Sequence, residues 1–188
     1  MKKACIVLII VLIATSAVLF LRDHMKGAQI SSVILNARNL YYTLTLDPPS
    51  NILTYELLPR SDGTKSYETS TDYFRTLIES GKVNSSFFAA PGIHSPGSDD
   101  PEAFQSTNNA WCIVEDLPTS GDVNSPAIFT RNIQIESLNQ LARLTDNPPF
   151  GQRAGIIVTK GGVALSLDEE TINQYFAGQK MTNRVLRP

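Results

Sequence analysis

The 188-residue chain has few of the side chains that most often carry chemistry: two histidines, two cysteines and one tryptophan. Neither His24 nor His94 has a partner at the spacing of a metal site or a catalytic triad. His94 beside Ser95 is a conceivable base and nucleophile, but histidines in loops rich in glycine and proline are mostly solvated. There is also no nucleophile elbow or phosphate-binding loop. We therefore predict no catalytic, cofactor-binding or metal-binding residues, and a protein that is not an enzyme.

The two cysteines are too few for a disulfide framework. Cys5 lies in an apolar run near the N-terminus, and a bridge to Cys112 would require its thiol to leave that run. Cys5 also does not fit a lipidation site, because the lipidated cysteine would follow the apolar run rather than begin it. Cys112 lies between Trp111 and Ile113 in a strand-like stretch, where a buried, inert thiol is expected.

Neither sign of charge dominates the sequence, whose formal net charge is −2. Lys2 and Lys3, two of the 16 basic residues, precede the apolar run, so the part after it carries 14 basic and 18 acidic residues and a net charge of −4. This balance gives no electrostatic reason to bind nucleic acid, and we expect no such partner.

The apolar run, residues 4–21, contains no charge, proline or glycine. Eighteen helical residues span roughly 27 Å, close to the thickness of a bilayer core. We therefore predict an N-terminal transmembrane segment, residues 1–27. It would cross a bilayer once and leave residues 28–188 outside the cytoplasm.

A cleavable signal peptide is the alternative for this segment, since small residues that suit a cleavage site lie within it. These residues are Ala14, Ser16 and Ala17. The apolar run continues past them to Leu21, which favours a retained anchor. Either interpretation exports the rest of the chain.

After the apolar run, the pattern of one face of an α-helix appears between residues 28 and 46. Its apolar residues, at spacings of three and four, are Ile30, Val33, Ile34, Ala37, Leu40, Tyr41 and Leu44. Pro48 and Pro49 should end this helix. Gly27 is a weak point of only about 1 kcal/mol, so we predict one helix from residue 4 to about 46, roughly 65 Å long. Its first half would face lipid and its second half would pack on a soluble domain.

Short elements follow the long helix. Residues 61–64 read as a turn, and residues 72–80 as a short helix capped by Ser70 or Thr71. Residues 91–101, rich in proline, glycine, serine and aspartate, read as a surface loop.

Four strands are predicted next, at residues 110–117, 127–133, 155–159 and 163–167. Lys160, Gly161 and Gly162 join the last two as a hairpin. Alternation along the last strand predicts one buried face with Val163, Leu165 and Leu167.

A closing helix should start after Ser166 or Asp168 and bury Ile172, Tyr175 and Phe176. Residues 137–144 suggest another short helix. We predict an α+β fold in which one long N-terminal helix packs on a small antiparallel β-sheet.

Several residues have both a functional and a structural interpretation. Asp99, Asp100 and Glu102, and a looser set of Glu115, Asp116 and Asp122, offer the oxygen ligands that calcium prefers. The first set lacks the spacing of a calcium loop, so we interpret both as solvated charge and expect no cofactor, with calcium as the alternative.

Gly161 and Gly162 could suggest a phosphate-binding site, but they join two strands and precede no helix, which favours a hairpin turn. We assign four aromatic residues to the core, with a partner interface as the alternative for Trp111: Trp111, Phe129, Tyr175 and Phe176.

Four short motifs occur in a recognisable order. They are Ala37-Arg38-Asn39-Leu40, Ser70-Thr71-Asp72-Tyr73-Phe74, Asn109-Ala110-Trp111 and the hairpin Gly161-Gly162-Val163-Ala164-Leu165-Ser166-Leu167-Asp168. Together with the long half-apolar, half-amphipathic helix, this order resembles type IV pilin-like proteins and, more narrowly, the pseudopilins of type II secretion systems.

The resemblance implies a pilin-like fold and a non-enzymatic, membrane-anchored subunit or accessory of a secretion or pilus-like assembly. It also implies that the chain crosses the bacterial inner membrane once, with residues 28–188 in the periplasm. Its partners would be the lipid bilayer and other pilin-like or secretion-machine subunits, contacted through the N-terminal helix. The small residues of that helix would allow close helix approach.

The chain departs from the family at the processing site. Family members carry a glycine after which the prepilin peptidase cuts, and a glutamate at the fifth position of the mature chain. The glutamate pairs with a neighbouring subunit's N-terminal amine. Residues 1–5 contain no such glycine, and residues 4–21 contain no acid. The resemblance therefore allows an anchored monomer or an accessory as well as a filament subunit.

Two alternatives remain open. One is a membrane-tethered or secreted periplasmic binding module that uses the loop at residues 91–101. The other is an exported hydrolase with an unrecognised site.

Overall fold

The computed structural model describes residues 2–47, 52–53, 58–61, 67–118, 120–135, 137–180 and 182–188. Within residues 2–53, it describes the side chains at 15–16, 20 and 25–46. The chain divides into two compact units, Met1–Val33 and Ile34–Pro188. Except for Ser61, the predicted turn at residues 61–64 lies outside the described residues.

Helix α1 comprises Lys2–Thr45, so the predicted long helix is confirmed and ends one residue before its expected stop. The predicted boundary residue Gly27 lies inside it. In the part of the chain that the structure describes, no helix combines the length and the apolarity needed to cross a membrane. Most side chains of the predicted transmembrane segment, residues 1–27, lie outside the described residues.

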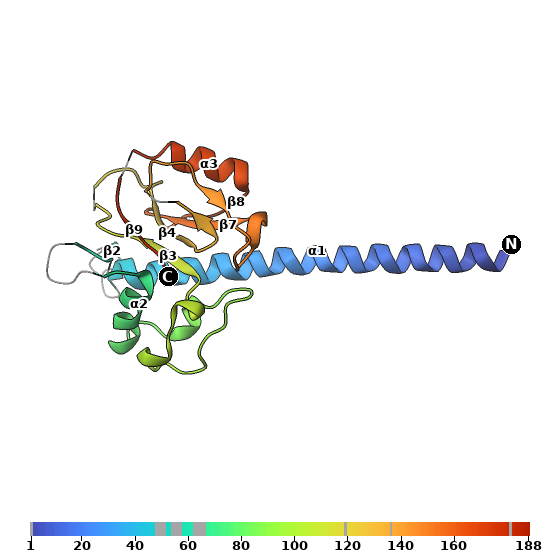
Figure 1. The fold of residues 1–188 in the computed structure, drawn as a ribbon, viewed down its shortest axis with the longest axis horizontal. Coiled ribbons are helices and arrows are strands. Elements are labelled where there is room, and N and C mark those ends of the chain that lie inside the picture. The colour runs from blue at the N-terminus through green and yellow to red at the C-terminus, as the bar shows by residue number, and fades with distance from the viewer. Residues whose placement is uncertain are drawn as a thin grey trace. The chain divides into compact units, whose positions relative to one another are not determined.

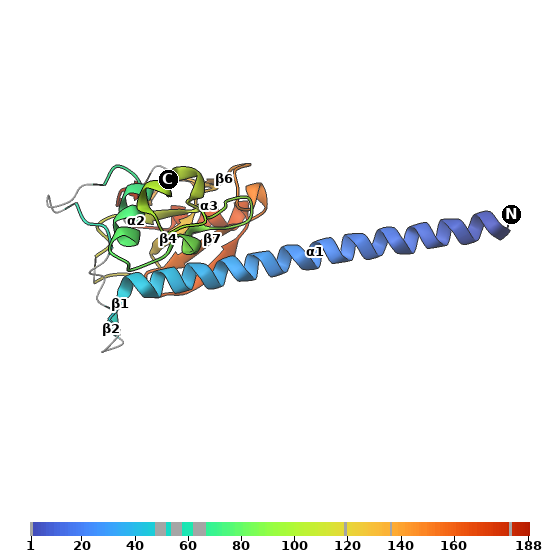
Figure 2. The same cartoon turned by 90° about the horizontal axis from the view of Figure 1, so that it is seen from below.

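The last three turns of α1 belong to the second unit and have the predicted buried stripe. Ala37, Leu40, Tyr41 and Leu44 are buried there, and the Tyr41 hydroxyl donates a hydrogen bond to the carbonyl oxygen of Lys160. Figures 1 and 2 show that residues 34–45 run beside the sheet. The amphipathic half of α1 therefore forms part of the core of the head, as predicted. Strand β1 (Leu46–Asp47) follows and pairs with β2 (Ile52–Leu53).

Five antiparallel strands form the central sheet in the order β8-β7-β4-β3-β9 (Figure 1). Their bounds are β3 (Trp111–Val114), β4 (Pro126–Thr130), β7 (Gly155–Thr159), β8 (Ala164–Leu167) and β9 (Val185–Leu186). The predicted antiparallel sheet and the hairpin that joins β7 to β8 are confirmed. The predicted strand at 127–133 is divided between β4 and β5 (Ile133–Gln134), which pairs with β6 (Arg143–Leu144) outside the main sheet.

Helix α3 (Glu169–Ala177) packs against the sheet face that carries Phe129, whose ring centroid lies 5.5 Å from that of Phe176. Asp168 is its N-cap, as predicted, and Ile172 and Phe176 are buried. Tyr175 is only half-buried. The approach between these elements is close at Gly155, where a Cβ atom would lie 2.6 Å from Ile133 and 2.7 Å from Ile172.

Helix α2 (Ser70–Glu79) covers another part of the core with its aromatic side chains. A row of five rings links it to the segments that follow, with centroid spacings of 5.3, 5.2, 4.5 and 4.9 Å. The rings belong to Tyr67, Tyr73, Phe74, Phe88 and Phe104. Four short 3-10 helices complete the described elements: Ser85–Phe88, Pro101–Ala103, Ser106–Asn108 and Gly151–Arg153.

Two sequence predictions about this region are wrong. Residues 137–144 do not form a helix, because Arg143 and Leu144 pair with β5 and this strand pairing overrides local helix propensity. The predicted buried face of residues 163–167 is also absent. Val163 is 54% exposed, and Leu165 and Leu167 are half-buried, because β8 lies at the edge of the sheet.

Candidate functional site

The candidate site is a groove between α2 and the 3-10 helix Pro101–Ala103. Its volume is about 470 Å³, and four of its six lining residues are ionisable. The lining residues are Asp72, Arg75, Thr76, Glu79, Pro101 and Glu102. Of these, only Glu102 was among the candidate ligand residues considered from sequence, whereas Asp72 was named only as part of a helix and a motif.

A capping box fixes the start of α2 and so positions Asp72. The Thr69 hydroxyl accepts a hydrogen bond from the Asp72 amide at 3.1 Å, and Asp72 Oδ2 accepts from the Thr69 amide at 3.2 Å. The predicted cap, Ser70 or Thr71, is therefore wrong. Both of these side chains face the interior, where Ser70 Oγ donates to the Trp111 carbonyl at 2.8 Å. Thr69 could have been identified from the spacing Thr-x-x-Asp.

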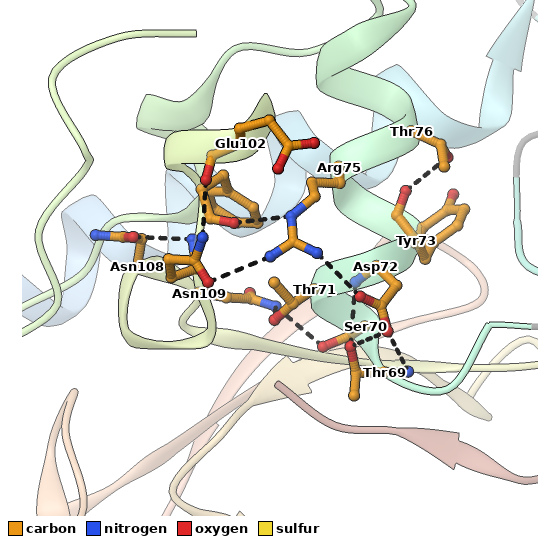
Figure 3. A network of polar contacts seen from close by, with 12 residues as sticks. Thr69, Ser70, Thr71, Asp72, Tyr73, Arg75, Thr76, Glu102, Asn108 and Asn109 are labelled. Atoms are coloured by element: carbon orange, nitrogen blue, oxygen red, sulfur yellow. Dashed lines mark hydrogen bonds and ion pairs between the residues drawn. The ribbon is translucent and has the colours of Figure 1, made fainter. Parts of the chain in front are cut away.

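Arg75 links α2 to the segment after the groove (Figure 3). Its Nε donates to the Phe104 carbonyl at 3.0 Å, Nη1 to Asp72 Oδ1 at 3.1 Å, and Nη2 to Gln105 Oε1 at 3.4 Å. All three nitrogens of the guanidinium group thus have partners within the protein. Phe104 and Gln105 lie about 30 positions away in sequence, so no local pattern could have identified this role.

Behind the groove, the buried side chain of Asn109 connects α2 to β3 (Figure 3). Its Nδ2 donates to Ser70 Oγ at 3.0 Å and to Thr71 Oγ1 at 3.2 Å, and its Oδ1 accepts from the Trp111 amide at 2.9 Å. These bonds satisfy polar groups that would otherwise be buried without partners. The network is therefore structural, and it holds the wall of the groove in place.

Tyr73 is not available as an acid or base near neutral pH. Burial raises the pKa of its hydroxyl far above the ordinary value, and the neighbouring Tyr67 raises it further. The exposed ionisable groups at the rim of the groove are Glu79 and Glu102. The groove can therefore offer surface contacts to a polar ligand, but it holds no activated nucleophile.

The candidate residues in and beside the loop at residues 91–101 form hydrogen bonds that stabilise the loop itself. Ser95 Oγ lies 2.9 Å from Ser85 Oγ, and the Ser85 amide donates to Asp99 Oδ1 at 2.6 Å. Asp100 Oδ1 accepts from the Glu102 amide at 3.0 Å. His94 is exposed, and its main-chain carbonyl accepts from Asn108 Nδ2 at 2.8 Å. The predicted surface loop is confirmed, and its acids stabilise turns. The side chain of His24 lies outside the described residues.

The second acidic set also has structural partners. Glu115 is 1% exposed and forms an ion pair with Arg184 at 3.5 Å. Asp116 accepts a hydrogen bond from the Ser61 amide at 2.8 Å, and Asp122 accepts from the Asn124 amide at 2.9 Å. Across the described ranges, no group of three histidine, cysteine or acidic side chains is arranged to hold a metal ion.

The residues around Trp111 belong to the core. Its ring is fully buried and its Nε1 donates to the Phe87 carbonyl at 3.1 Å, as expected of a core residue rather than of an interface.

Cys112 is buried as predicted, and burial raises the pKa of its thiol to about 11. The Gly162 amide donates to the Thr159 carbonyl within the hairpin, and the Gly161 amide donates to the Val123 carbonyl in the segment before β4.

Two further grooves lie beside the β5–β6 pair, with volumes of about 440 and 490 Å³. Both include Gln134 and Arg143, which are joined by a 2.9 Å hydrogen bond between Arg143 Nε and Gln134 Oε1. Arg143 is thus held by its own hairpin, as Arg75 is held by its neighbours.

The described residues of the second unit therefore form an α+β head whose candidate residues are held by hydrogen bonds within the protein, with polar grooves on its surface. Comparison with known proteins adds no relative, because no family model, no curated protein and no solved structure matches this chain.

Proposed function

We propose that this chain is a non-enzymatic, membrane-anchored subunit or accessory of a type II secretion or type IV pilus-like assembly, with its head in the periplasm. One observation carries the proposal. A single helix, α1, begins with the apolar sequence 4–21 and ends with turns that are buried in an antiparallel α+β head. That combination suits a protein held at a membrane by the helix that also organises its folded part.

The sequence of the first half favours an accessory role over that of a filament-forming subunit. Residues 4–21 contain no acid, so the pairing of a carboxylate with a neighbour's N-terminal amine is unavailable. Without it, contacts with other helices depend on close packing at the small residues Ala14, Ser16 and Ala17.

Membrane attachment is tested by fractionating cells that express the full chain. We expect the chain in the membrane pellet after carbonate extraction, with Met1 intact by N-terminal sequencing. Leu12→Lys puts a charge at the middle of the apolar run, which costs about 2.5–3.5 kcal/mol of insertion, and should reduce the membrane fraction. Leu35→Lys is the matched control, because it lies in the same helix but is 57% exposed in the head unit.

Recovery of a soluble periplasmic chain whose N-terminus lies just after Ala17 would overturn the anchor and leave a secreted binding module. Equal losses from the membrane in the Leu12→Lys and Leu35→Lys variants would also contradict the proposal. The apolar run would then have no special role in attachment.

The assembly role needs a separate test. A photo-crosslinking residue at Ala17 should form adducts with proteins that have their own N-terminal apolar helix of the pilin type, while one at the exposed Ser31 should not. Adducts with lipid alone, in a chain that stays in the membrane, would refute the assembly role and keep the anchor.

A further inference from the structure

The two edges of the central sheet differ in how their backbone groups are used. At the β9 edge, the backbone forms hydrogen bonds on both sides of the strand. On one side β9 pairs with β3. On the other side, the Ser70 amide donates to the Arg187 carbonyl at 2.9 Å, and Arg184 forms an isolated β-bridge with Ser137. At the β8 edge, the described residues add no hydrogen bond beyond the ladder to β7. We call the β9 edge closed, because its outward backbone groups have partners, and the β8 edge open, because no described residue bonds to its outward backbone groups.

The register shows which backbone groups are open. The Thr159 amide donates to the Val163 carbonyl at 2.9 Å, so Val163 points its backbone groups toward β7. The ladder then continues with Ile157 opposite Leu165. Since backbone direction alternates along an antiparallel strand, the amides and carbonyls of Ala164 and Ser166 point away from the sheet.

Apart from its short length of four residues, the open edge lacks the features that usually prevent strands from pairing. Protected edges carry charges, prolines or bulges, whereas β8 has the sequence Ala-Leu-Ser-Leu and a regular register with β7. Two of the exposed large apolar side chains, Val163 and Val123, lie at the turn that leads into β8; they are 54% and 57% exposed.

We propose that β8 pairs antiparallel with β8 of a second copy of this chain about a two-fold axis at Leu165. In this register Ala164 exchanges two hydrogen bonds with Ser166 of the other copy, and Ser166 exchanges two with Ala164. Val163 lies opposite Leu167 on the same face, so an exposed side chain gains an apolar partner.

Charge selects this direction of pairing. Three exposed acids, Asp168, Glu169 and Glu170, follow β8 directly. Antiparallel pairing puts the acids of the two copies at opposite ends of the paired strands, with Asp168 near Gly162 of the other copy. Parallel pairing would place like charges side by side, which is destabilising. The charges around β8 therefore favour antiparallel pairing with the same strand of a second copy.

The contact is small, so trapping by a disulfide is the appropriate measurement. It uses the full chain in detergent in a Cys5→Ser background, where Cys112 is buried. Leu165→Cys should give a disulfide-linked dimer on mild oxidation, because directly opposite residues at a non-hydrogen-bonded position lie within disulfide reach. A mixture of Val163→Cys and Leu167→Cys chains should give the mixed dimer. Leu141→Cys, 76% exposed elsewhere on the head, is the control that should stay monomeric.

Ala164→Pro removes an outward amide while leaving the bonds to β7 in place. It should abolish the Leu165→Cys dimer while Cys112 remains unreactive, which reports an intact fold. The proposal is overturned by an absence of dimer in Leu165→Cys, by equal dimer in the Leu141→Cys control, or by failure of the Val163→Cys and Leu167→Cys mixture. The result is independent of membrane attachment, so it can fail while the proposed function stands.

Discussion

Helices α2 and α3 are similar in length but are attached to the head by different means. Helix α2 buries six residues, two of which, Ser70 and Thr71, are polar and bonded to Asn109. Helix α3 buries only Ile172 and Phe176, and its cap, Asp168, is exposed. Helix α2 is held by apolar contacts and a buried polar network. Helix α3 is held by apolar contacts, by its solvent-facing cap, and by two hydrogen bonds outside the core, from the Leu144 amide to Glu169 and from the Tyr175 hydroxyl to the Asn124 carbonyl.

The difference determines how each helix can move. When a helix shifts, buried donors and acceptors lose their hydrogen-bond partners, so such a network opposes even small displacements of the helix. An apolar contact tolerates small shifts. We therefore expect α3 to open locally at lower free energy than α2, as amide hydrogen exchange would detect.

The largest effects should come from the apolar anchors, where the two helices are most alike. Phe74→Ala and Phe176→Ala each remove a fully buried ring with two aromatic neighbours. Each should lower the free energy of unfolding by about 3–5 kcal/mol. Urea unfolding followed by the fluorescence of Trp111 measures this, with the exposed Leu141→Ala as control. A loss below about 1 kcal/mol in either variant would show that its helix is not an integral part of the folded unit.

A smaller effect should separate the helices. Asn109→Ala leaves Ser70, Thr71 and the Trp111 amide without their buried partner, so we expect a loss of about 2–3 kcal/mol. Amide exchange in α2 should accelerate more than in α3. The exposed Asn139→Ala is the matched control. If α2 and α3 respond equally, the buried network does not distinguish them.

The sequence predicted this fold where local periodicity and turn chemistry determine structure. Helix α1, strand β7, the glycine hairpin and the Asp168 cap all follow from residues close together in the chain. Strand β9 and the β5–β6 pair were missed, because each strand has only two residues, too few for a recognisable alternation. Strand β9 in addition exists only through β3, a partner far away in sequence. The candidate site was also missed, since Arg75 finds Phe104 and Gln105 only after folding.

The N-cap of α2 provides the next test. Thr69→Ala removes the oxygen that accepts from the Asp72 amide and should lower the free energy of unfolding by about 1 kcal/mol. Thr69→Ser keeps that oxygen and should restore most of the loss, as thermal unfolding of both variants would measure. An equal loss in the serine variant would mean that the methyl group, rather than the cap, matters.

The smallest effect concerns pH and α3. The Thr171 amide donates to Asp168 Oδ1 at 2.9 Å and holds the pKa of that carboxyl below its ordinary value. The folded pKa therefore lies below the unfolded one. The stabilisation is fully present above the unfolded pKa, near 3.9, and is lost as the pH falls through the folded value. Asp168→Asn should lower the melting temperature at pH 7 more than at pH 3, and an equal shift at both would exclude the carboxylate as the cause.

The closeness of Gly155 to Ile133 and Ile172 limits which sequences can adopt this head. Space, and not the backbone angle, favours a glycine there, since even one methyl group would overlap two isoleucine side chains unless both shift. An alanine at 155 would need both of those isoleucines to move or to be replaced by smaller residues. Related chains should therefore vary these positions together, so their covariation would be a signature by which distant relatives of this protein can be recognised.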